Sequence, residues 1–482
     1  MIYHHDRHVM ENLEGFEFYK SSIIKKDTSE LMMANRENTR YLIVKGNSTN
    51  QFQGDDIGLY RVCPLSSVNS RALRNLLPEY NPTPLKQDSI SFGFGDRLGF
   101  ATCGQLKSFN GNSIQPVIAQ QSIRELKQTG RSYEEVLADA IWGAFQAGYH
   151  GIFTADGDHL KSLEEVDQAI SAGYSMITID CSEKIHPEVY SLSNELKIQE
   201  YRLLPRQITK HYESKYLNTK LPIGEINETE LAECVLVYRD AIQFIKTVFD
   251  VYLSNRPNIS YEISIDETEW PTTAFAHYFI ASELIQFSNV RVDSIAPRFV
   301  GEFQKGIDYI GEISDFENHL SLHQGIAKQW GYKISIHSGS DKFSIFPSVT
   351  RITDRKYHIK TSGTSWVEFI RLLAVSNPEF FRELYHFCLE HLDEAKKSYV
   401  VSVTSSICPA IDKIDEMNYA ESLDNNHIRQ LFHITYGKIL QHQEDGKYIY
   451  RDRIYQILNQ EESKYHSIIQ SHFEKHLRAL NV

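Results

Sequence analysis

The chain has 482 residues, of which 41% are hydrophobic and 12% aromatic, and its formal net charge is −13. This length suits one large α/β barrel with additions, or two or three smaller domains. The negative charge argues against a nucleic-acid partner and favours a soluble protein that handles small molecules. The six cysteines form no CxxC pair and no run approaches the roughly 20 apolar residues that span a membrane, so we expect a reduced, cytoplasmic protein without a membrane partner.

Residues 1–88 do not fit the pattern of the rest of the chain. They contain one strand-like run at 41–44, a turn-rich stretch at 51–56 and a proline-rich end up to Pro84. We interpret them as an N-terminal appendage. The histidines between Met1 and His8 precede any periodic pattern, which predicts a solvated terminus rather than a metal cluster.

From residue 89 onward, short apolar or alternating runs end in polar or Gly/Pro turns, as strands do. There are eight of them, at 89–95, 115–120, 151–155, 174–180, 259–265, 290–295, 333–337 and 356–360. Segments with helical spacing, such as 133–145, lie between most of them. The alternation predicts an α/β fold, a TIM-like (β/α)₈ barrel over residues 89–375. A doubly wound open sheet is the alternative, and it would separate some strand ends.

Two parts of the chain are additions to the predicted barrel. Residues 183–258 are too long for one crossover and include two helical patterns, which indicates an insertion that is a candidate lid. Residues 376–482 are almost wholly helical and rich in aromatic residues, which is typical of packing or subunit contact. A homo-oligomer is compatible with this pattern.

Active sites of such barrels lie at the carboxyl ends of the strands, where this chain has many ionisable groups. Divalent ions such as Zn, Mn, Ni or Co favour imidazole and carboxylate ligands, and His159, Glu302 and His337 offer them after the third, sixth and seventh predicted strands. His323 lies in a helical segment and His358 precedes its strand end, so these two histidines are weaker candidates. One bound divalent ion is therefore predicted.

Two interpretations are possible for Asp158 and for the turn that follows His337. Asp158 precedes a helix, so it is either a proton-transfer group or a helix cap. The turn from Gly339 to Lys342 is either a helix start or a cradle for an anion. The chain has no GxGxxG or GxxxxGK[ST] motif, so no nucleotide cofactor is expected and a carboxylate or simple phosphate is favoured.

In three segments, 156–159 (Asp-Gly-Asp-His), 297–309 and 336–342 (Ile-His-Ser-Gly-Ser-Asp-Lys), the chain resembles the tagaturonate epimerase family. This resemblance covers nearly the whole chain and implies a metal-dependent interconversion of D-tagaturonate and D-fructuronate. The short Asp-His and His-Ser-Gly-Ser motifs are also similar to class II metal-dependent aldolases. In those enzymes the Asp transfers protons, the adjacent His binds zinc and the later turn holds the anionic end of the substrate.

Retro-aldol chemistry explains how such an epimerase would work. The two ketouronates differ at C3, counted from the carboxylate, and the C3 hydrogen is not α to the C5 ketone. Removal of the C3 hydroxyl proton instead permits cleavage of C3–C4 and re-addition. We choose Asp158 and Glu267, on different strands, as the acid/base pair. Lys342 with the turn of Gly339 and Ser340 is predicted to hold the substrate carboxylate.

The remaining predicted substrate contacts lie at the same rim and are Gln120, Arg298, Lys305, Ser338, Asp341 and Thr361. A metal-dependent aldolase or ketose isomerase on the same barrel is the alternative enzyme. A non-catalytic protein that binds sugar acids is the alternative from another class.

Overall fold

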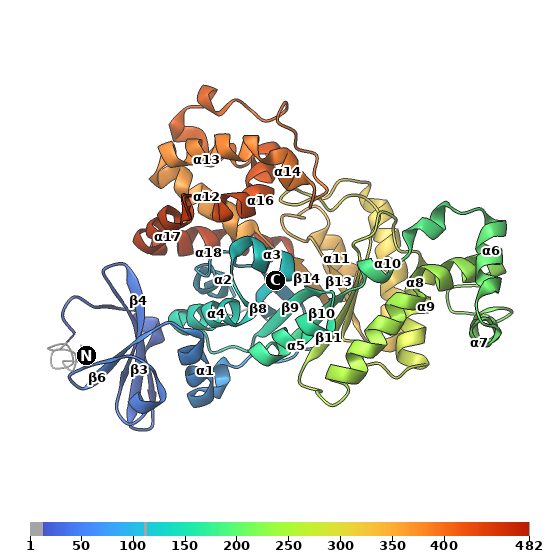
Figure 1. Ribbon diagram of the computed structural model, residues 1–482, viewed down its shortest axis with the longest axis horizontal. Coiled ribbons are helices and arrows are strands. Elements are labelled where there is room, and N and C mark those ends of the chain that lie inside the picture. The colour runs from blue at the N-terminus through green and yellow to red at the C-terminus, as the bar shows by residue number, and fades with distance from the viewer. Residues whose placement is uncertain (1–12, 110–112, 482) are drawn as a thin grey trace.

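The computed structural model describes residues 13–109 and 113–481 (Figure 1). The predicted solvated terminus from Met1 to His8 lies outside the described residues. Eight parallel strands close into a barrel, which confirms the predicted fold class. They are β7 (Ser91–Phe94), β8 (Gln115–Ser122), β9 (Thr154–Leu160), β10 (Met176–Asp180), β11 (Ser260–Ile265), β12 (Ser294–Pro297), β13 (Lys333–Ile336) and β14 (Tyr357–Thr361).

The barrel closes where the last strand pairs with the first. His358 of β14 lies opposite Ser91 of β7 in parallel register, so the open-sheet alternative is wrong. Every residue of β10 and β11 is buried, as expected of parallel strands covered by helices on the outside and by side chains within. Each predicted run overlaps an observed strand, although β9 and β12 begin three to four residues later than predicted.

Helices cover the outside of the barrel. They are α2 (Thr102–Lys107), α3 (Ile123–Thr129), α4 (Tyr133–Ala147), α5 (Leu163–Ala172), α8 (Glu228–Val248), α9 (Ala274–Ala281), α10 (Ile313–Trp330), α11 (Phe346–Ile352) and α12 (Thr364–Ser376). The sequence sets their ends clearly. In α4, Ser132 and Glu135 form a capping box, and Gly148 ends the helix in the left-handed conformation that favours glycine.

The N-terminal part is an antiparallel sheet of six short strands, seen edge-on in Figure 1. The strands are β1 (Glu17–Phe18), β2 (Ile24–Lys26), β3 (Ser29–Arg36), β4 (Thr39–Lys45), β5 (Asp55–Ile57) and β6 (Tyr60–Pro64), followed by α1 (Ser67–Leu76). One face of β3 and β4, with Leu31, Met33, Leu42 and Val44, joins the main hydrophobic core. The sequence suggested only β4, because the other strands are short or carry polar residues.

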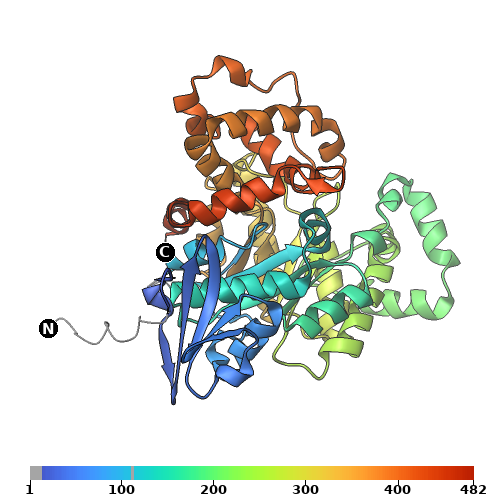
Figure 2. The same ribbon diagram turned by 60° about the vertical axis from the view of Figure 1, so that its left-hand side comes forward.

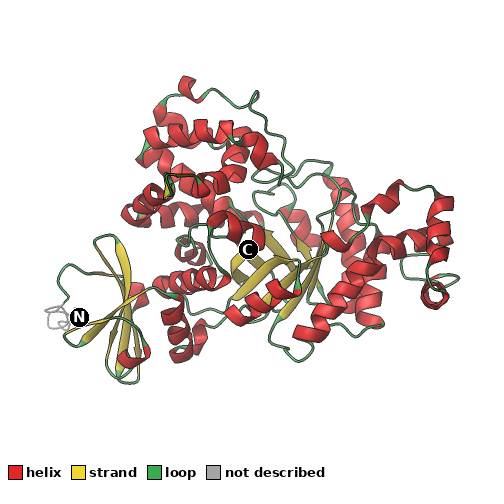
Figure 3. Cartoon of the chain, in the orientation of Figure 1, coloured by secondary structure: helices red, strands yellow, loops and turns green. Residues whose placement is uncertain are grey.

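The two additions to the barrel are helical (Figure 3). Between β10 and β11 the chain forms α6 (Asn194–Leu203), α7 (Arg206–Tyr216) and α8, and Figures 1 and 2 both show α6 and α7 extending away from the barrel. The C-terminal part contains α13 (Pro378–Glu390), α14 (Leu392–Lys396), α15 (Tyr419–Ser422), α16 (Asn426–Gln441), the hairpin β15 (Gln443–Glu444) and β16 (Lys447–Tyr448), α17 (Arg451–Gln460) and α18 (Glu462–Ala479). Among the described residues, no helix has the length and apolar character that crossing a membrane requires.

Candidate active site

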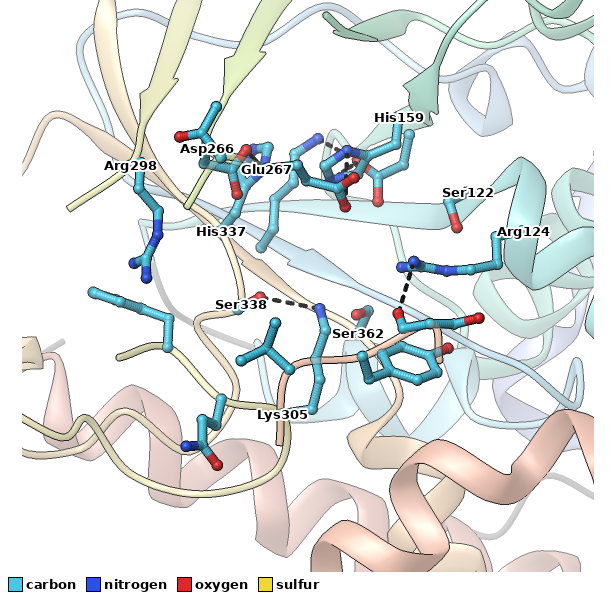
Figure 4. Close-up of a pocket in the computed structure, with 18 of the residues that line it drawn as sticks. Ser122, Arg124, His159, Asp266, Glu267, Arg298, Lys305, His337, Ser338 and Ser362 are labelled. Carbon is cyan, nitrogen blue, oxygen red and sulfur yellow. Dashed lines mark hydrogen bonds and ion pairs between the residues drawn. The ribbon is translucent and has the colours of Figure 1, made fainter. Parts of the chain in front are cut away.

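A cavity of about 840 Å³ lies at the carboxyl ends of the barrel strands (Figure 4). Its volume falls within the range of small-molecule sites. Polar side chains at the ends of six strands, β8, β9, β11, β12, β13 and β14, line it, together with a segment of the C-terminal part at 396–400. The predicted site residues that line it are Gln120, Asp158, His159, Glu267, Arg298, Glu302, Lys305, His337 and Ser338.

Bulges in β8 and β9 shape the wall of this cavity. Each strand contains one extra residue relative to its partner, and a left-handed residue lies at each bulge, Ala119 (φ 57°) and His159 (φ 53°). Neighbouring residues of a regular strand point to opposite sides, but a bulge re-aims them. This is why both Asp158 and His159 reach the cavity. The following helix is capped by Ser162, so helix capping is the wrong reading of Asp158.

His159 is surrounded by carboxylates. Its Nδ1 lies 3.2 Å from Asp180 Oδ2 and 3.9 Å from Glu267 Oε1, whereas its Nε2 lies 3.8 Å from Asp158 Oδ1. Burial disfavours the imidazolium, but the three carboxylates outweigh it and raise the pKa of His159 to about 10. The site around this ring therefore attracts positive charge.

His337 lies beside His159, with ring centroids 5.1 Å apart. Its Nε2 is 2.8 Å from Glu262 Oε1. Its buried Nδ1 lies 3.0 Å from Asp266 Oδ1, in a geometry that makes no hydrogen bond. Burial opposes ionisation of Asp266, but the neighbouring His337 outweighs burial and holds the pKa of Asp266 well below its usual value. Asp266 has no role in the sequence-based prediction.

Lys360 joins the carboxylates at the base of the cavity. Its Nζ lies 2.6 Å from Asp156, 2.7 Å from Asp158 and 2.8 Å from Glu262. Burial by itself would lower the pKa of Lys360. The three carboxylates outweigh burial and raise that pKa above its usual value. Burial would also raise the pKa of Asp158, but Lys360 lowers it, so Asp158 is a carboxylate at neutral pH.

Positive side chains lie across the cavity from the imidazoles, as Figure 4 shows. Lys305 Nζ donates to Ser338 Oγ at 3.0 Å, and Arg124 Nη1 donates to the carbonyl of Ser398 at 3.3 Å. The Arg124 guanidinium also lies 4.8 Å from the centre of the Tyr399 ring. Burial, and then the charge of Arg124, lower the pKa of Lys305. The cavity thus has an anionic wall and a cationic wall.

Other residues predicted to contact substrate lie behind the cavity wall. Lys342 is fully buried, and its ammonium donates to the backbone carbonyls of Gln304 (2.8 Å) and Ser340 (3.0 Å). Ser340 Oγ itself accepts the backbone N–H of Ser362.

Two further members of this group are also bound within the protein. Asp341 binds Arg429 at 2.8 Å, and Thr361 Oγ1 donates to the carbonyl of Gly93 at 2.7 Å. At Gly339 an added Cβ would lie 2.8 Å from Ile359, so the turn packs against β14. These contacts support the cavity wall and leave the predicted role of Lys342 in carboxylate binding without structural support.

The remaining candidates for metal ligands differ in their surroundings. Glu302 lines the cavity but is exposed, and it accepts a hydrogen bond from Gln304 Nε2 at 2.5 Å. His323 is buried between α9 and α10, where its Nδ1 lies 2.8 Å from that of His277. His358 lies in the barrel interior, 3.0 Å from Ser91 Oγ. The carboxylates nearest the two cavity imidazoles are instead Glu262 and Asp266 beside His337 and Asp180 beside His159.

A closed (β/α)₈ barrel with paired imidazoles and carboxylates at its carboxyl rim has the architecture of a barrel enzyme. The sequence profile of tagaturonate epimerase matches residues 19–480. A tagaturonate/fructuronate epimerase of Thermotoga maritima is 33% identical, with 97% of each chain covered. The chain belongs to the tagaturonate epimerase family, whose members are isomerases.

Solved structures agree with this assignment. The glycerol-complexed crystal structure of fructuronate-tagaturonate epimerase from Cohnella laeviribosi matches with a TM-score of 0.94 and 39% identity, covering 97% of this chain and 96% of that one. Its native crystal structure matches with the same TM-score and 38% identity, covering 98% and 99%.

Proposed function

We propose that the protein interconverts D-tagaturonate and D-fructuronate in this cavity. Family membership supports this reaction, and the main structural support for it is the distribution of charge in the cavity. The cavity holds a lysine-positioned carboxylate and two imidazoles on one wall, and Lys305 and Arg124 on the facing wall. A ketouronate has a ketone with neighbouring hydroxyls at one end and a carboxylate at the other, which is the matching distribution of charge.

We propose that one divalent ion, such as Zn, Mn, Ni or Co, binds to His159, His337 and Asp266. His337 Nδ1 is buried and has no hydrogen-bond partner in the described part of the chain, as is expected of an atom that binds a metal ion. Asp180 and Glu262 face the other nitrogens of the two rings, the arrangement that orients metal-binding imidazoles. Asp266 replaces Glu302 as the carboxylate ligand in this proposal. Such an ion supplies Lewis-acid polarisation of a ketone.

The acid/base role of Asp158 follows from its protonation state. Asp158, held as a carboxylate by Lys360, takes the proton of the C3 hydroxyl. The C3–C4 bond then breaks, its electron pair moves to C4, and the C3 oxygen becomes an aldehyde. Rotation of that aldehyde fragment and re-formation of C3–C4 invert C3. Glu267, after a different strand, donates a proton to the re-formed C3 oxygen on the opposite face, and proton exchange with water then returns Asp158 and Glu267 to their starting states.

The cationic wall is proposed to hold the substrate carboxylate. Lys305 and Arg124 are held in this wall by hydrogen bonds to Ser338 and to the carbonyl of Ser398. Two cations fix the anionic end of the substrate and leave its ketone at the imidazole wall.

Incubation of the purified protein with D-tagaturonate in D₂O, with and without a chelator, tests this function when products are read by NMR. We expect D-fructuronate without deuterium at C3, because the C3–H bond stays intact, and we expect the chelator to abolish turnover. Stoichiometric deuterium at C3 would contradict the retro-aldol route. Accumulated three-carbon fragments would indicate an aldolase, and the absence of any product would indicate a binding protein.

A further inference from the structure

The two cations of the cationic wall come from opposite sides of the barrel. Arg124 lies in α3, which follows β8, and Lys305 lies in the loop after β12. Around the closed barrel the strands run in the order β10, β11, β12, β13, β14, β7, β8 and β9, so β12 and β8 are half a circle apart. Pairing between neighbouring strands therefore does not by itself fix these two side chains relative to each other.

One segment of the C-terminal part, residues 397–402, contacts the surroundings of both cations, and we call it the strap. On the α3 side, the carbonyl of Ser398 accepts a hydrogen bond from Arg124 Nη1 at 3.3 Å, and the ring centre of Tyr399 lies 4.8 Å from the guanidinium. The Tyr399 hydroxyl donates to Gln128 Oε1 at 3.4 Å, one turn further along α3. Tyr399 is half-buried and the residues on either side of it are exposed, so its side chain attaches the strap to α3.

The other end of the strap is fixed beside Lys305. The backbone N–H of Ser402 donates to Gln304 Oε1 at 2.8 Å, and the same oxygen accepts a hydrogen bond from Gln430 Nε2 at 2.8 Å. Val403, the next residue of the chain, is fully buried. Because Gln304 directly precedes Lys305, the strap is attached to the loop that carries the second cation.

The guanidinium of Arg124 has few other contacts that hold it in place. Among the described residues its only hydrogen bond is the one to the carbonyl of Ser398, and its buried Nε has no partner there. The face of an aromatic ring attracts a guanidinium without using any of its N–H donors. Tyr399 can therefore position Arg124 and leave donors for the carboxylate of a ligand.

We propose that the strap fixes Arg124 relative to Lys305, with Tyr399 as the positioning residue, and thereby makes the site selective for ketoses that carry a carboxylate. This inference rests on the proposed function, in which Arg124 and Lys305 hold the substrate carboxylate. The imidazole wall lies across the cavity from these cations, so the ketone end of the substrate is independent of the strap (Figure 4). The C-terminal part is then a determinant of substrate specificity.

Kinetics of Tyr399 variants test the proposal. Tyr399→Leu removes the ring and should raise KM for D-tagaturonate about fivefold or more, with little change in kcat or in the inhibition constant of an uncharged ketohexose. Tyr399→Phe keeps the ring beside the guanidinium and should restore most of the affinity that Tyr399→Leu loses. Tyr448→Leu is the matched control, because it removes a ring 3.8 Å from Arg451, outside the cavity, and should leave all three constants unchanged.

A double variant shows whether Tyr399 acts through Arg124. Calorimetry with D-gluconate, a six-carbon sugar acid that lacks the ketone, measures carboxylate binding without turnover. Arg124→Met/Tyr399→Leu should bind D-gluconate no more weakly than Arg124→Met alone, because the ring has no guanidinium left to position.

The inference is overturned if Arg124→Met weakens D-gluconate binding and Tyr399→Leu does not, or if the losses of the two single variants add. A different result marks failure of the proposed function. If Arg124→Met and Lys305→Met both bind D-gluconate as the wild type does, these cations do not hold the carboxylate, and the selectivity assigned to the strap is wrong with them.

Discussion

At the scale of single residues, the structure places two carboxylates in different surroundings, Asp158, which the sequence assigns to acid/base chemistry, and Glu302, which it assigns to metal binding. Asp158 is buried, held by Lys360 and faces His159, whereas Glu302 is exposed at the edge of the cavity. Asp158→Asn should therefore lose about 10²-fold or more in turnover, the scale of a positioned acid/base, while keeping the bound metal. Steady-state kinetics with metal analysis of each variant measure this.

Glu302→Gln serves as the matched control, because it changes an exposed carboxylate of the same cavity. We expect it to keep its metal and most of its turnover. Loss of the ion from Glu302→Gln would restore Glu302 as a ligand, and near-normal turnover of Asp158→Asn would remove Asp158 from acid/base chemistry.

Two lysines near the cavity should behave differently when replaced. Lys305 lines the cavity, so Lys305→Met should raise KM for ketouronates about tenfold or more and have a much smaller effect on uncharged ketoses. Lys342 donates to buried carbonyls, so Lys342→Met should instead lower the stability by about 1–3 kcal/mol. Kinetics with both substrate types and urea unfolding separate the two effects. An equal rise in KM for charged and neutral substrates would remove Lys305 from carboxylate binding.

Sequence reasoning found the site residues that lie at or just after strand ends. Asp158, His159 and His337 reach the cavity for this reason. Lys342 does not, because the chain turns back through left-handed residues at Ser338 (φ 50°) and Asp341 (φ 60°), and spacing along the sequence cannot show such a reversal.

The site residues without a role in the sequence-based prediction lie in different parts of the fold. Arg124 is inside α3, Lys360 is inside β14, and Tyr399 comes from the C-terminal part. Asp266 lies in the polar run after β11. Its position opposite His337, which the sequence does not show, distinguishes it from the other residues of that run.

At the scale of elements, the barrel strands were predictable because they are buried, whereas their irregularities were not. Apolar runs in the sequence predict all eight strands, but no sequence pattern indicates the bulge in β8 or the bulge in β9. These bulges decide which side chains face the cavity. The sheet before the barrel was largely missed, because strands as short as β1, β2 and β5 contain only two or three residues each.

The bulge in β8 gives a test at this scale. Ala119 has a left-handed conformation (φ 57°) that costs a β-branched residue more than it costs alanine. Ala119→Val should therefore lose roughly 1–3 kcal/mol of stability and should lower turnover by displacing Gln120. Ala119→Gly, the control, accepts this conformation and should stay close to wild type in both measurements. Equal thermal stability and turnover for Ala119→Val would show that the bulge does not constrain the site.

At the scale of the whole molecule, the site depends on contact between the barrel and the C-terminal helices. The segment at 396–400 completes the cavity, and α16 packs on α3 beside it. Arg97 joins these parts. Its guanidinium binds Glu125 at 3.0 Å, donates to the carbonyl of His433 at 3.0 Å and lies 3.5 Å from the centre of the Tyr436 ring.

Replacement of Arg97 tests whether this contact supports both stability and substrate binding. Arg97→Met leaves the buried carboxylate of Glu125 without its partner, which should cost about 3–5 kcal/mol of unfolding free energy. Removing that charge as well, in Arg97→Met/Glu125→Gln, should recover part of the loss while the glutamine keeps capping α3. Since the C-terminal part forms one side of the cavity, Arg97→Met should also raise KM. Urea unfolding of the single and double variants measures the coupling, and additive losses would show that Arg97 and Glu125 act independently.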